Sequence, residues 1–363
     1  MKILAANYGS FPRIGDFLES QQLKVATEAF QRGELKERQL ELAKNEAVRE
    51  VLAAQAKAGL DAVSDGQIRW DDAVSHFMGK FSGVSIAGLL RYYDTNTYFR
   101  QPVVTGAMEP LSEFVVSELK LARAISTKPV IARITGPLTL SRLSLLRGGP
   151  YKNADALASA LAPHLAAEVE RLASAGAAEI VVEESALLRE PRALPVLEDA
   201  LEVLAARRGS VRLWLFPSFG DASPVYERLQ KLPVDGLILD LTYSTAAAEA
   251  VISSGSSLAL GLGLVDARNT MMESPVKLAK LAAGLIRRVH GQIVMLVPSN
   301  GLEFLPRTVA LRKLAVLARV RDLLTGASAG RMARGKKRAA SPRRPRPRPK
   351  SRRVGGRRRA RRR

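Results

Sequence analysis

The sequence has no cysteine, few aromatic residues and no long apolar run. The lack of cysteine and the lack of a long apolar run each exclude a class of protein. Without cysteine in 363 residues, disulfides, thiolate nucleophiles and thiolate metal sites are excluded. No run approaches the roughly 18 consecutive apolar residues of a membrane helix. The opening MKILAAN also turns polar too soon for a secretory signal. We therefore expect a cytoplasmic protein with no membrane contact.

Positive charge is concentrated at the C-terminal end. Of 56 lysines and arginines, 18 lie in residues 331–363, which contain no acidic residue. The other 330 residues carry 38 basic and 35 acidic side chains, so the net charge of +21 belongs mostly to this end. Because the segment has no apolar periodicity, we predict a disordered tail at residues 331–363. Two interpretations stay open: the tail binds nucleic acid, or it is a solvated extension.

Residues 1–330 alternate between short apolar runs and longer segments with helical spacing. The strand-like runs are Ile3–Ala6, Asp61–Ser64, Val130–Thr135, Glu179–Glu183, Val211–Phe216, Gly236–Asp240, Ser257–Gly261 and Ile293–Val297. The helical segments are Glu34–Ala58, Leu111–Ile125, Ala154–Ala175, Pro195–Ala206, Ser223–Lys231, Ala246–Ser253, Ser274–His290 and Arg307–Leu324. Eight such units predict an α/β fold, a single (β/α)₈ TIM barrel over residues 1–330. An open doubly wound sheet is the alternative, although no G-x-G-x-x-G follows the first strand.

Polar residues follow almost every predicted strand. They are Asn7, Asp65, Thr135, Glu183, Glu184, Ser218, Asp240, Asp266, Ser299 and Asn300. In a barrel the carboxyl ends of the strands meet at one face, so these residues predict a polar, mostly acidic pocket. Each of them could instead cap the following helix or close a turn. The three histidines, His76, His164 and His290, are far apart and have no metal-ligand spacing.

A series of motifs in fixed order carries a family resemblance. The series is NYGSFPRIG from Asn7, RYYDTNTY from Arg91, ITGPLT from Ile134, VVEESAL from Val181, SFGD from Ser218, LPVDGLILDL from Leu232 and GLVDARNT from Gly263. It resembles cobalamin-independent methionine synthase from about Asn7 to Leu317. Full-length members have two similar (β/α)₈ barrels, and this chain resembles a single stand-alone barrel, most like the N-terminal half that lacks zinc.

The resemblance implies binding sites for the methyl donor and for homocysteine. The positions that contact the glutamate tail of the folate donor correspond to Lys24 and Arg91, and Arg13 offers a guanidinium suited to a carboxylate. The positions that hold homocysteine in the catalytic barrel correspond to Ser10, Gln67 and Glu183. In the family two of these positions are acids. Here only Glu183 is acidic, and the other position is Gln67.

The resemblance also places the zinc ligands of the family, a His-x-Cys pair, a Glu and a Cys. They correspond to Leu215, Pro217, Asp240 and Asn300. One carboxylate does not make a zinc site, and thiol activation by zinc needs one. We therefore expect no cofactor on this chain and a zinc-bearing barrel of the same family as its partner.

Three functions remain open. The first is a methionine-synthase component that binds a methylated folate or pterin for methyl transfer to homocysteine together with the zinc-bearing barrel. The second is a metal-free methyltransferase, or a corrinoid- or porphyrin-type barrel enzyme with another substrate. The third is a binding module that acts on nucleic acid through residues 331–363. Thermal shifts with folates, corrinoids and amino acids separate the first two, and salt-dependent nucleic-acid binding tests the third.

Overall fold

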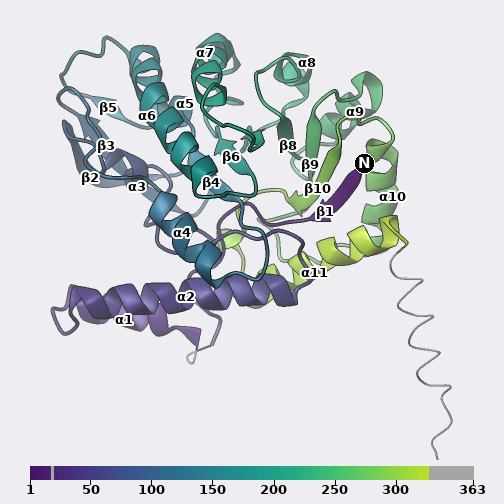
Figure 1. The fold of residues 1–363 in the computed structure, drawn as a ribbon, viewed down its shortest axis with the longest axis horizontal. Coiled ribbons are helices and arrows are strands. Elements are labelled where there is room, and N and C mark those ends of the chain that lie inside the picture. Colours follow the sequence, from purple (N-terminus) through teal and green to yellow (C-terminus); the bar gives the residue numbers. More distant parts are fainter. Residues whose placement is uncertain (18–19, 327–363) are drawn as a thin grey trace, which may run out of the picture. The chain divides into compact units, whose positions relative to one another are not determined.

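A closed ring of eight parallel strands forms the centre of the protein in the computed structural model, which describes residues 1–17 and 20–326. Seven strands form one sheet in the order β1-β10-β9-β8-β7-β6-β4 (Figure 1). They are β1 (Lys2–Ala5), β4 (Ala132–Thr135), β6 (Ile180–Glu183), β7 (Leu213–Phe216), β8 (Gly236–Asp240), β9 (Ala259–Val265) and β10 (Ile293–Pro298). The eighth place is taken by Ala62, which pairs with Ala6, and Val63, which pairs with Val130. These bridges close the predicted (β/α)₈ barrel.

All eight predicted strand runs lie in this ring. The largest shift is at β9, which starts at Ala259 and continues to Val265, beyond the predicted end at Gly261. Glycine allows this extension, because a Cβ at Gly261 would lie 2.6 Å from Ile238 Cγ1 and one at Gly263 would lie 2.6 Å from the Leu239 carbonyl oxygen. The glycines therefore let β9 lie close against β8.

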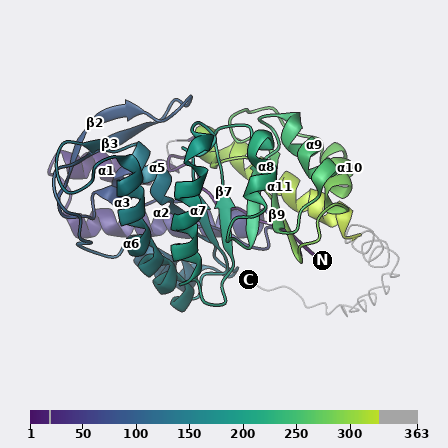
Figure 2. The same cartoon turned by 90° about the horizontal axis from the view of Figure 1, so that it is seen from above.

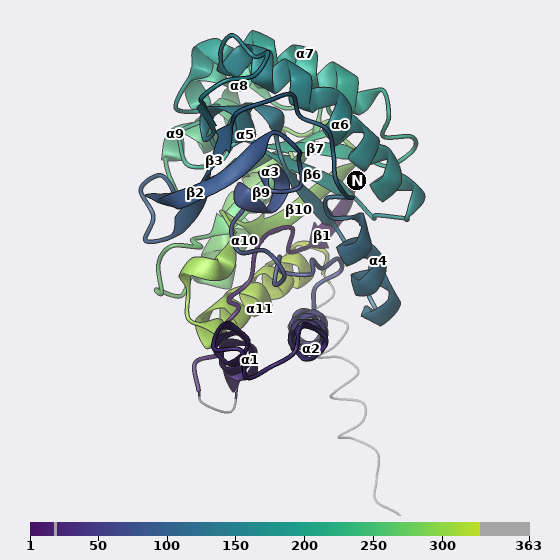
Figure 3. The same cartoon turned by 90° about the vertical axis from the view of Figure 1, so that its left-hand side faces the viewer.

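Helices surround the strands (Figure 1). They are α1 (Gln22–Gln31), α2 (Glu37–Lys57), α3 (Ser75–Met78), α4 (Val116–Ile125), α5 (Pro137–Arg142), α6 (Ala154–Ser174), α7 (Leu194–Ala205), α8 (Tyr226–Leu229), α9 (Thr245–Ser254), α10 (Pro275–Ile286) and α11 (Arg307–Leu324). Every predicted helical segment overlaps one of them, although a 3₁₀ turn at Ser223–Val225 precedes the short α8. The sequence did not predict α1, α3 or α5. Figure 3 shows α1 beside α2, outside the repeating units of the barrel.

A second, three-stranded sheet was not predicted from the sequence. Its strands β2 (Val84–Arg91) and β3 (Tyr98–Val104) pair antiparallel, and the short β5 (Leu145–Leu146) pairs parallel with β3. Figures 1 and 2 place this sheet at the end of the barrel away from α9 and α10. Most of β2 is exposed and its sequence does not alternate between apolar and polar residues, so it lacks the usual strand signal. The turn between β2 and β3 contains the DTN motif.

Two hydrophobic clusters hold the barrel together. The smaller one lies inside the ring and contains Tyr8, Trp214, Phe216, Ile238 and Met295, all of them fully buried. The larger cluster packs the outer faces of the strands against the helices. Because the interior is filled with side chains, the barrel has no open pore, and a ligand site is confined to the strand ends.

The described residues up to Thr325 form one compact unit. The predicted end of the barrel, residue 330, lies outside the described residues. The predicted tail, residues 331–363, lies outside the described residues. None of the described helices combines the length and the apolar character needed to cross a membrane.

Candidate functional site

A pocket of about 210 Å³ opens at the carboxyl ends of the barrel strands. Its polar lining includes residues from five separate segments of the chain: Ser10, Gln67, Arg133, Glu183, Asn300 and Glu303. This is the face of a (β/α)₈ barrel on which ligands bind. Of the residues that the sequence placed at the strand ends, Ser10, Gln67, Glu183 and Asn300 line this pocket.

An ion pair between Arg133 and Glu183 forms the polar centre of the pocket. The side chains are only 5% and 2% exposed, and the guanidinium of Arg133 contacts Glu183 Oε2 through Nη2. Arg133 Nη1 also donates to Ser10 Oγ over 2.9 Å. Glu183 Oε1 accepts from Ser218 Oγ at 2.7 Å and from Ser185 Oγ at 3.1 Å. Burial opposes the charge of Arg133, but Glu183 and Glu303 raise its pKa, so it stays a cation.

Aromatic rings form the apolar part of the pocket wall. Tyr92 and Phe99 from the β2–β3 hairpin lie with their ring centroids 6.0 Å apart, and Phe219 lies 5.6 Å from Tyr92. Trp70 contributes another ring, over which the Arg133 guanidinium lies at 5.7 Å. The pocket thus combines a charged centre with an aromatic wall, which suits a small ligand with one polar and one apolar end.

Besides Glu183 Oε2, which forms the ion pair with Arg133, four polar side-chain atoms of the pocket residues have neither solvent contact nor a hydrogen-bond partner within the described residues. Two are donors, Arg133 Nε and Asn300 Nδ2, and two are acceptors, Gln67 Oε1 and Glu303 Oε2. Buried polar atoms normally have hydrogen-bond partners. Several unpaired atoms in one pocket therefore indicate a bound molecule that supplies the missing hydrogen bonds. A ligand with both acceptor and donor groups would do so.

Glu184 does not line the pocket, although the sequence placed it there with Glu183. Its carboxylate accepts from the backbone N–H groups of Leu138 and Thr139, at 3.0 and 2.7 Å, at the start of α5. A Cβ at Gly136 would overlap this carboxylate, so glycine is required there. Burial raises the pKa of Glu184 to about 7. Its role is to satisfy the N-terminus of α5.

Replacing Glu184 with alanine is expected to lower the free energy of unfolding by about 2 kcal/mol. The change leaves two buried N–H donors and the Thr139 hydroxyl without their acceptor. Urea unfolding at pH 6 measures the effect. The matched control is Glu202→Gln on the exposed face of α7, which is expected to change stability by less than about 0.5 kcal/mol. Equal stability of the two variants would contradict the capping role.

The positions that correspond to the zinc ligands of the family do not fit a metal. Leu215 and Pro217 have no donor atoms in their side chains. Asp240 Oδ1 accepts from Thr242 N and Oγ1 at 2.8 and 2.7 Å, and its Oδ2 pairs with Arg268 at 3.0 Å. Asp240 is the only carboxylate of the set, and the positive charge of Arg268 already compensates it. A metal cation at this position is therefore disfavoured. Among the described residues no group of three or more His, Asp or Glu side chains could hold a metal ion.

The remaining predicted pocket residues lie behind or beside the pocket. Ser218 supports Glu183, as described above, and Thr135 Oγ1 donates to the Ala73 carbonyl oxygen at 2.7 Å. Asp266 Oδ1 accepts from the backbone N–H of Arg268 at 2.9 Å and shapes the loop after β9. Asp240 and Asp266 both face Arg268. These side chains therefore have structural partners and do not line the ligand pocket.

The three residues assigned to the folate tail are not gathered at one place. Arg13 lines the pocket and donates to the Trp70 carbonyl oxygen at 2.6 Å. Arg91 donates to the Thr95 carbonyl oxygen at 2.8 Å and so fixes the β2–β3 turn. Lys24 lies on α1, half-exposed and 3.9 Å from Glu28. Arg13 is therefore the one of these three that contacts the pocket.

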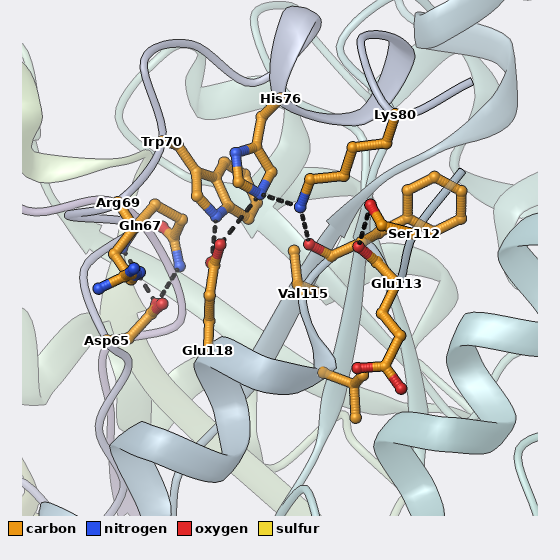
Figure 4. Close-up of polar contacts among 12 residues, drawn as sticks. Asp65, Gln67, Arg69, Trp70, His76, Lys80, Ser112, Glu113, Val115 and Glu118 are labelled. Carbon is orange, nitrogen blue, oxygen red and sulfur yellow. Dashed lines mark hydrogen bonds and ion pairs between the residues drawn. The ribbon is translucent and has the colours of Figure 1, made fainter. Parts of the chain in front are cut away.

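Asp65 lies behind the pocket wall in a cluster of buried polar groups (Figure 4). Its Oδ1 accepts from both the backbone N–H and the Nε2 of Gln67 at 3.0 Å. Nearby, Glu118 accepts from Trp70 Nε1 at 2.7 Å and contacts His76 Nε2 at 3.1 Å. Asp65 and Glu118 also line a cavity of about 20 Å³, large enough for one water molecule.

The ionisation of Asp65 depends on its burial and on the neighbouring charged groups. Although Asp65 as a residue keeps some solvent contact, its carboxyl group is enclosed. Burial and the neighbouring Glu118 together raise the pKa of Asp65 to about 7. Asp65 therefore acts on the pocket through Gln67, which it holds at the positive φ of 48°.

Glu303 and the aromatic wall are the pocket residues that the sequence analysis missed. The set of strand ends stopped at Asn300, and Glu303 lies one short turn further along the chain. A usable signal was Gly301, three residues after the end of β10, with an acid two residues further on. Tyr92 and Phe99 of this wall were missed because they lie on the unpredicted β2–β3 hairpin.

The fold and the site together define a (β/α)₈ barrel protein with a small-ligand pocket at the carboxyl ends of its strands. A family model described as "Cobalamin-independent synthase, Catalytic domain" matches residues 6–214. This is more than half of the chain, which therefore belongs to the cobalamin-independent synthase family, as the motifs predicted. The match includes Ser10, Gln67, Arg133 and Glu183 and ends one residue before Leu215.

Curated relatives agree with this assignment, and solved structures agree with the fold. Methionine synthase of Sulfurisphaera tokodaii is 28% identical over 83% of this chain and 88% of the relative, and that of Saccharolobus solfataricus is 29% identical over 84% and 90%. A B12-independent methionine synthase from Shewanella sp. W3-18-1, solved in complex with selenomethionine, has a TM-score of 0.75 at 21% identity and covers 91% of this chain and 100% of its own. A methyltransferase from Methanosarcina mazei has a TM-score of 0.55 at 12% identity, over 88% and 94%. The two structures support the fold.

Proposed function

We propose that this chain takes part in methyl transfer to homocysteine and that its pocket binds the amino acid. The observation that carries the proposal is the convergence of Ser10, Gln67 and Glu183 on one pocket. The resemblance assigns these three positions to homocysteine. The unpaired donors of Arg133 and Asn300 suit a carboxylate, and the unpaired acceptors suit an ammonium group. The aromatic wall suits the thioether end of methionine.

The similar structures add support of a general kind. The Shewanella protein was solved with selenomethionine, a close analogue of the methionine that such a reaction forms. The curated relatives that match most of this chain are named methionine synthase. A pocket of about 210 Å³ is small, which suits a ligand such as an amino acid.

We propose further that zinc and the methyl donor are brought by other components. The donor is of the folate type, as the resemblance implies, and Arg13 at the pocket edge offers it a cation. Thiol activation by zinc requires ligands that Leu215, Pro217, Asp240 and Asn300 do not supply. A second barrel of the family would therefore hold the zinc. This chain's own contribution is to bind and orient the amino acid and to exclude water from it.

Titration calorimetry with homocysteine and with methionine at pH 7.5 tests amino-acid binding. Wild type is expected to bind both, and Glu183→Gln is expected to weaken binding at least about tenfold, which is about 1.4 kcal/mol. Glu202→Gln is the control and is expected to bind like wild type. If Glu183→Gln also binds like wild type, the pocket does not bind the amino acid.

A methyl-transfer assay tests the second part of the proposal. The chain and methyltetrahydrofolate are expected to form no methionine from homocysteine until a zinc-bearing barrel of the family is added. Transfer by this chain alone without added zinc would favour the metal-free alternative. Stoichiometric zinc in the purified chain, with methyl transfer that depends on it, would contradict our conclusion that this chain lacks zinc ligands.

A further inference from the structure

The loop after β10 brings a carboxylate with no cationic partner to the pocket. Glu303 lies in the 3₁₀ turn Leu302–Phe304 and lines the pocket. Its carboxyl group is enclosed, and its Oε2 has no hydrogen-bond partner within the described residues. An enclosed carboxylate is costly unless a donor or a positive charge compensates it. Such a group is a candidate for contact with a ligand.

The other charges of the pocket are already compensated. Arg133 forms its ion pair with Glu183, Arg13 lies 3.6 Å from Asp71, and Arg100 lies 3.9 Å from Asp72. Within the described residues, no lysine, arginine or histidine forms an ion pair with Glu303. Burial raises the pKa of Glu303, whereas Arg133 at longer range lowers it. The inner pocket therefore carries one excess negative charge when Glu303 is ionised, and a positive group on the ligand would balance it.

Because Gly301 has no side chain, it leaves room for the carboxyl group of Glu303. A Cβ on Gly301 would overlap Glu303 Oε2, and the nearest atoms to such a Cβ all belong to the Glu303 carboxyl group. The backbone at Gly301 has φ −56° and ψ 144°, which any residue adopts. Glycine is thus required there for the side chain of Glu303 and not for the backbone. The Ser10 hydroxyl interacts with the Glu303 carboxyl group and lowers its pKa.

We propose that Glu303 receives the ammonium group of the bound amino acid and makes the pocket selective for ligands that carry a primary amine. The inference rests on the proposed function. The resemblance assigns two acids to homocysteine, at the positions of Gln67 and Glu183. Gln67 is neutral here and its Nε2 donates to Asp65. Glu303, from a different strand end, supplies the second negative charge.

Calorimetry with a pair of ligands tests the assignment. Homocysteine and 4-mercaptobutanoate differ in the amino group, so the ratio of their affinities measures what that group contributes. Wild type is expected to prefer homocysteine at least about tenfold, because the ammonium group and a buried carboxylate form a charge-assisted hydrogen bond. Glu303→Gln is expected to bind homocysteine at least about tenfold more weakly and 4-mercaptobutanoate unchanged or more tightly. The preference of the variant would then be close to one.

A second variant separates the position of the carboxylate from its presence. Gly301→Ala keeps Glu303 but displaces its carboxyl group, and we expect the same loss of preference in a folded protein. Glu202→Gln is the matched control and keeps the wild-type preference. An unchanged preference in both Glu303→Gln and Gly301→Ala would overturn the assignment while amino-acid binding, and with it the proposed function, stands. If wild type binds neither ligand, both the assignment and the proposed function are overturned.

Discussion

Replacing Arg133 with methionine is expected to lower the free energy of unfolding by about 3–5 kcal/mol and to abolish amino-acid binding. The change leaves the buried Glu183 carboxylate without its ion-pair partner, and removing one member of a buried pair costs this much. It also removes the donor to Ser10. Methionine is similar in length, so an empty cavity contributes little to the effect.

Urea unfolding and titration calorimetry measure the two effects of Arg133→Met. The control is the double variant Arg133→Met with Glu183→Gln, which removes both charges. It is expected to recover at least half of the lost stability, because no unpaired charge remains and the amide oxygen of the introduced glutamine would still accept from Ser218 and Ser185. Amino-acid binding is expected to stay lost in the double variant. A loss of less than about 1 kcal/mol in Arg133→Met would contradict the central role of the pair.

The protein is expected to lose stability as the pH rises from about 4 to about 7. The pKa of Asp65 is 3.8 for a free carboxyl group and about 7 in the folded protein. Between these values the folded protein holds a proton that the unfolded chain has released, so unfolding releases the proton and is favoured at higher pH. Glu184, with a pKa raised from 4.5 to about 7, acts in the same direction.

Asp65→Asn isolates the contribution of this one carboxyl group. Asparagine keeps an oxygen that accepts both hydrogen bonds from Gln67 and resembles the protonated acid. We expect wild type to lose about 2–4 kcal/mol relative to this variant between pH 4 and pH 7. Urea unfolding at several pH values measures the difference. Parallel pH profiles of wild type and Asp65→Asn would show that Asp65 does not titrate in this range.

The strand ends could be predicted from the sequence, but the roles of the residues there could not. Glu183 and Glu184 are neighbours in the sequence and were both assigned to the pocket. In a strand, successive side chains point to opposite faces, so only one of the two faces the barrel axis. Since β6 is buried on both faces, its apolar pattern does not show which one. The hydrogen bonds of Glu184 to the start of α5 decide it.

The assignment of cations to the folate tail shows a second limit. Arg91 matched the position of a charged residue beside the DTN motif. The structure shows that its guanidinium is used within the β2–β3 turn, by the Thr95 carbonyl oxygen and the Asn96 side chain. A sequence match records the type of a side chain at a position. It does not record whether a neighbouring backbone carbonyl has already taken its hydrogen bonds.

Local patterns of the sequence determined the eight strands, the main helices and the family, because apolar spacing and motif order are properties of short segments. Only the tertiary structure decided which polar groups share the pocket. Arg133 lies on β4, Glu183 on β6 and Glu303 in the loop after β10. Their positions depend on strand register, on closure of the ring and on the space that Gly301 leaves. These are long-range properties, so no single segment contains them, and they decide which charges are paired and which one remains for a ligand.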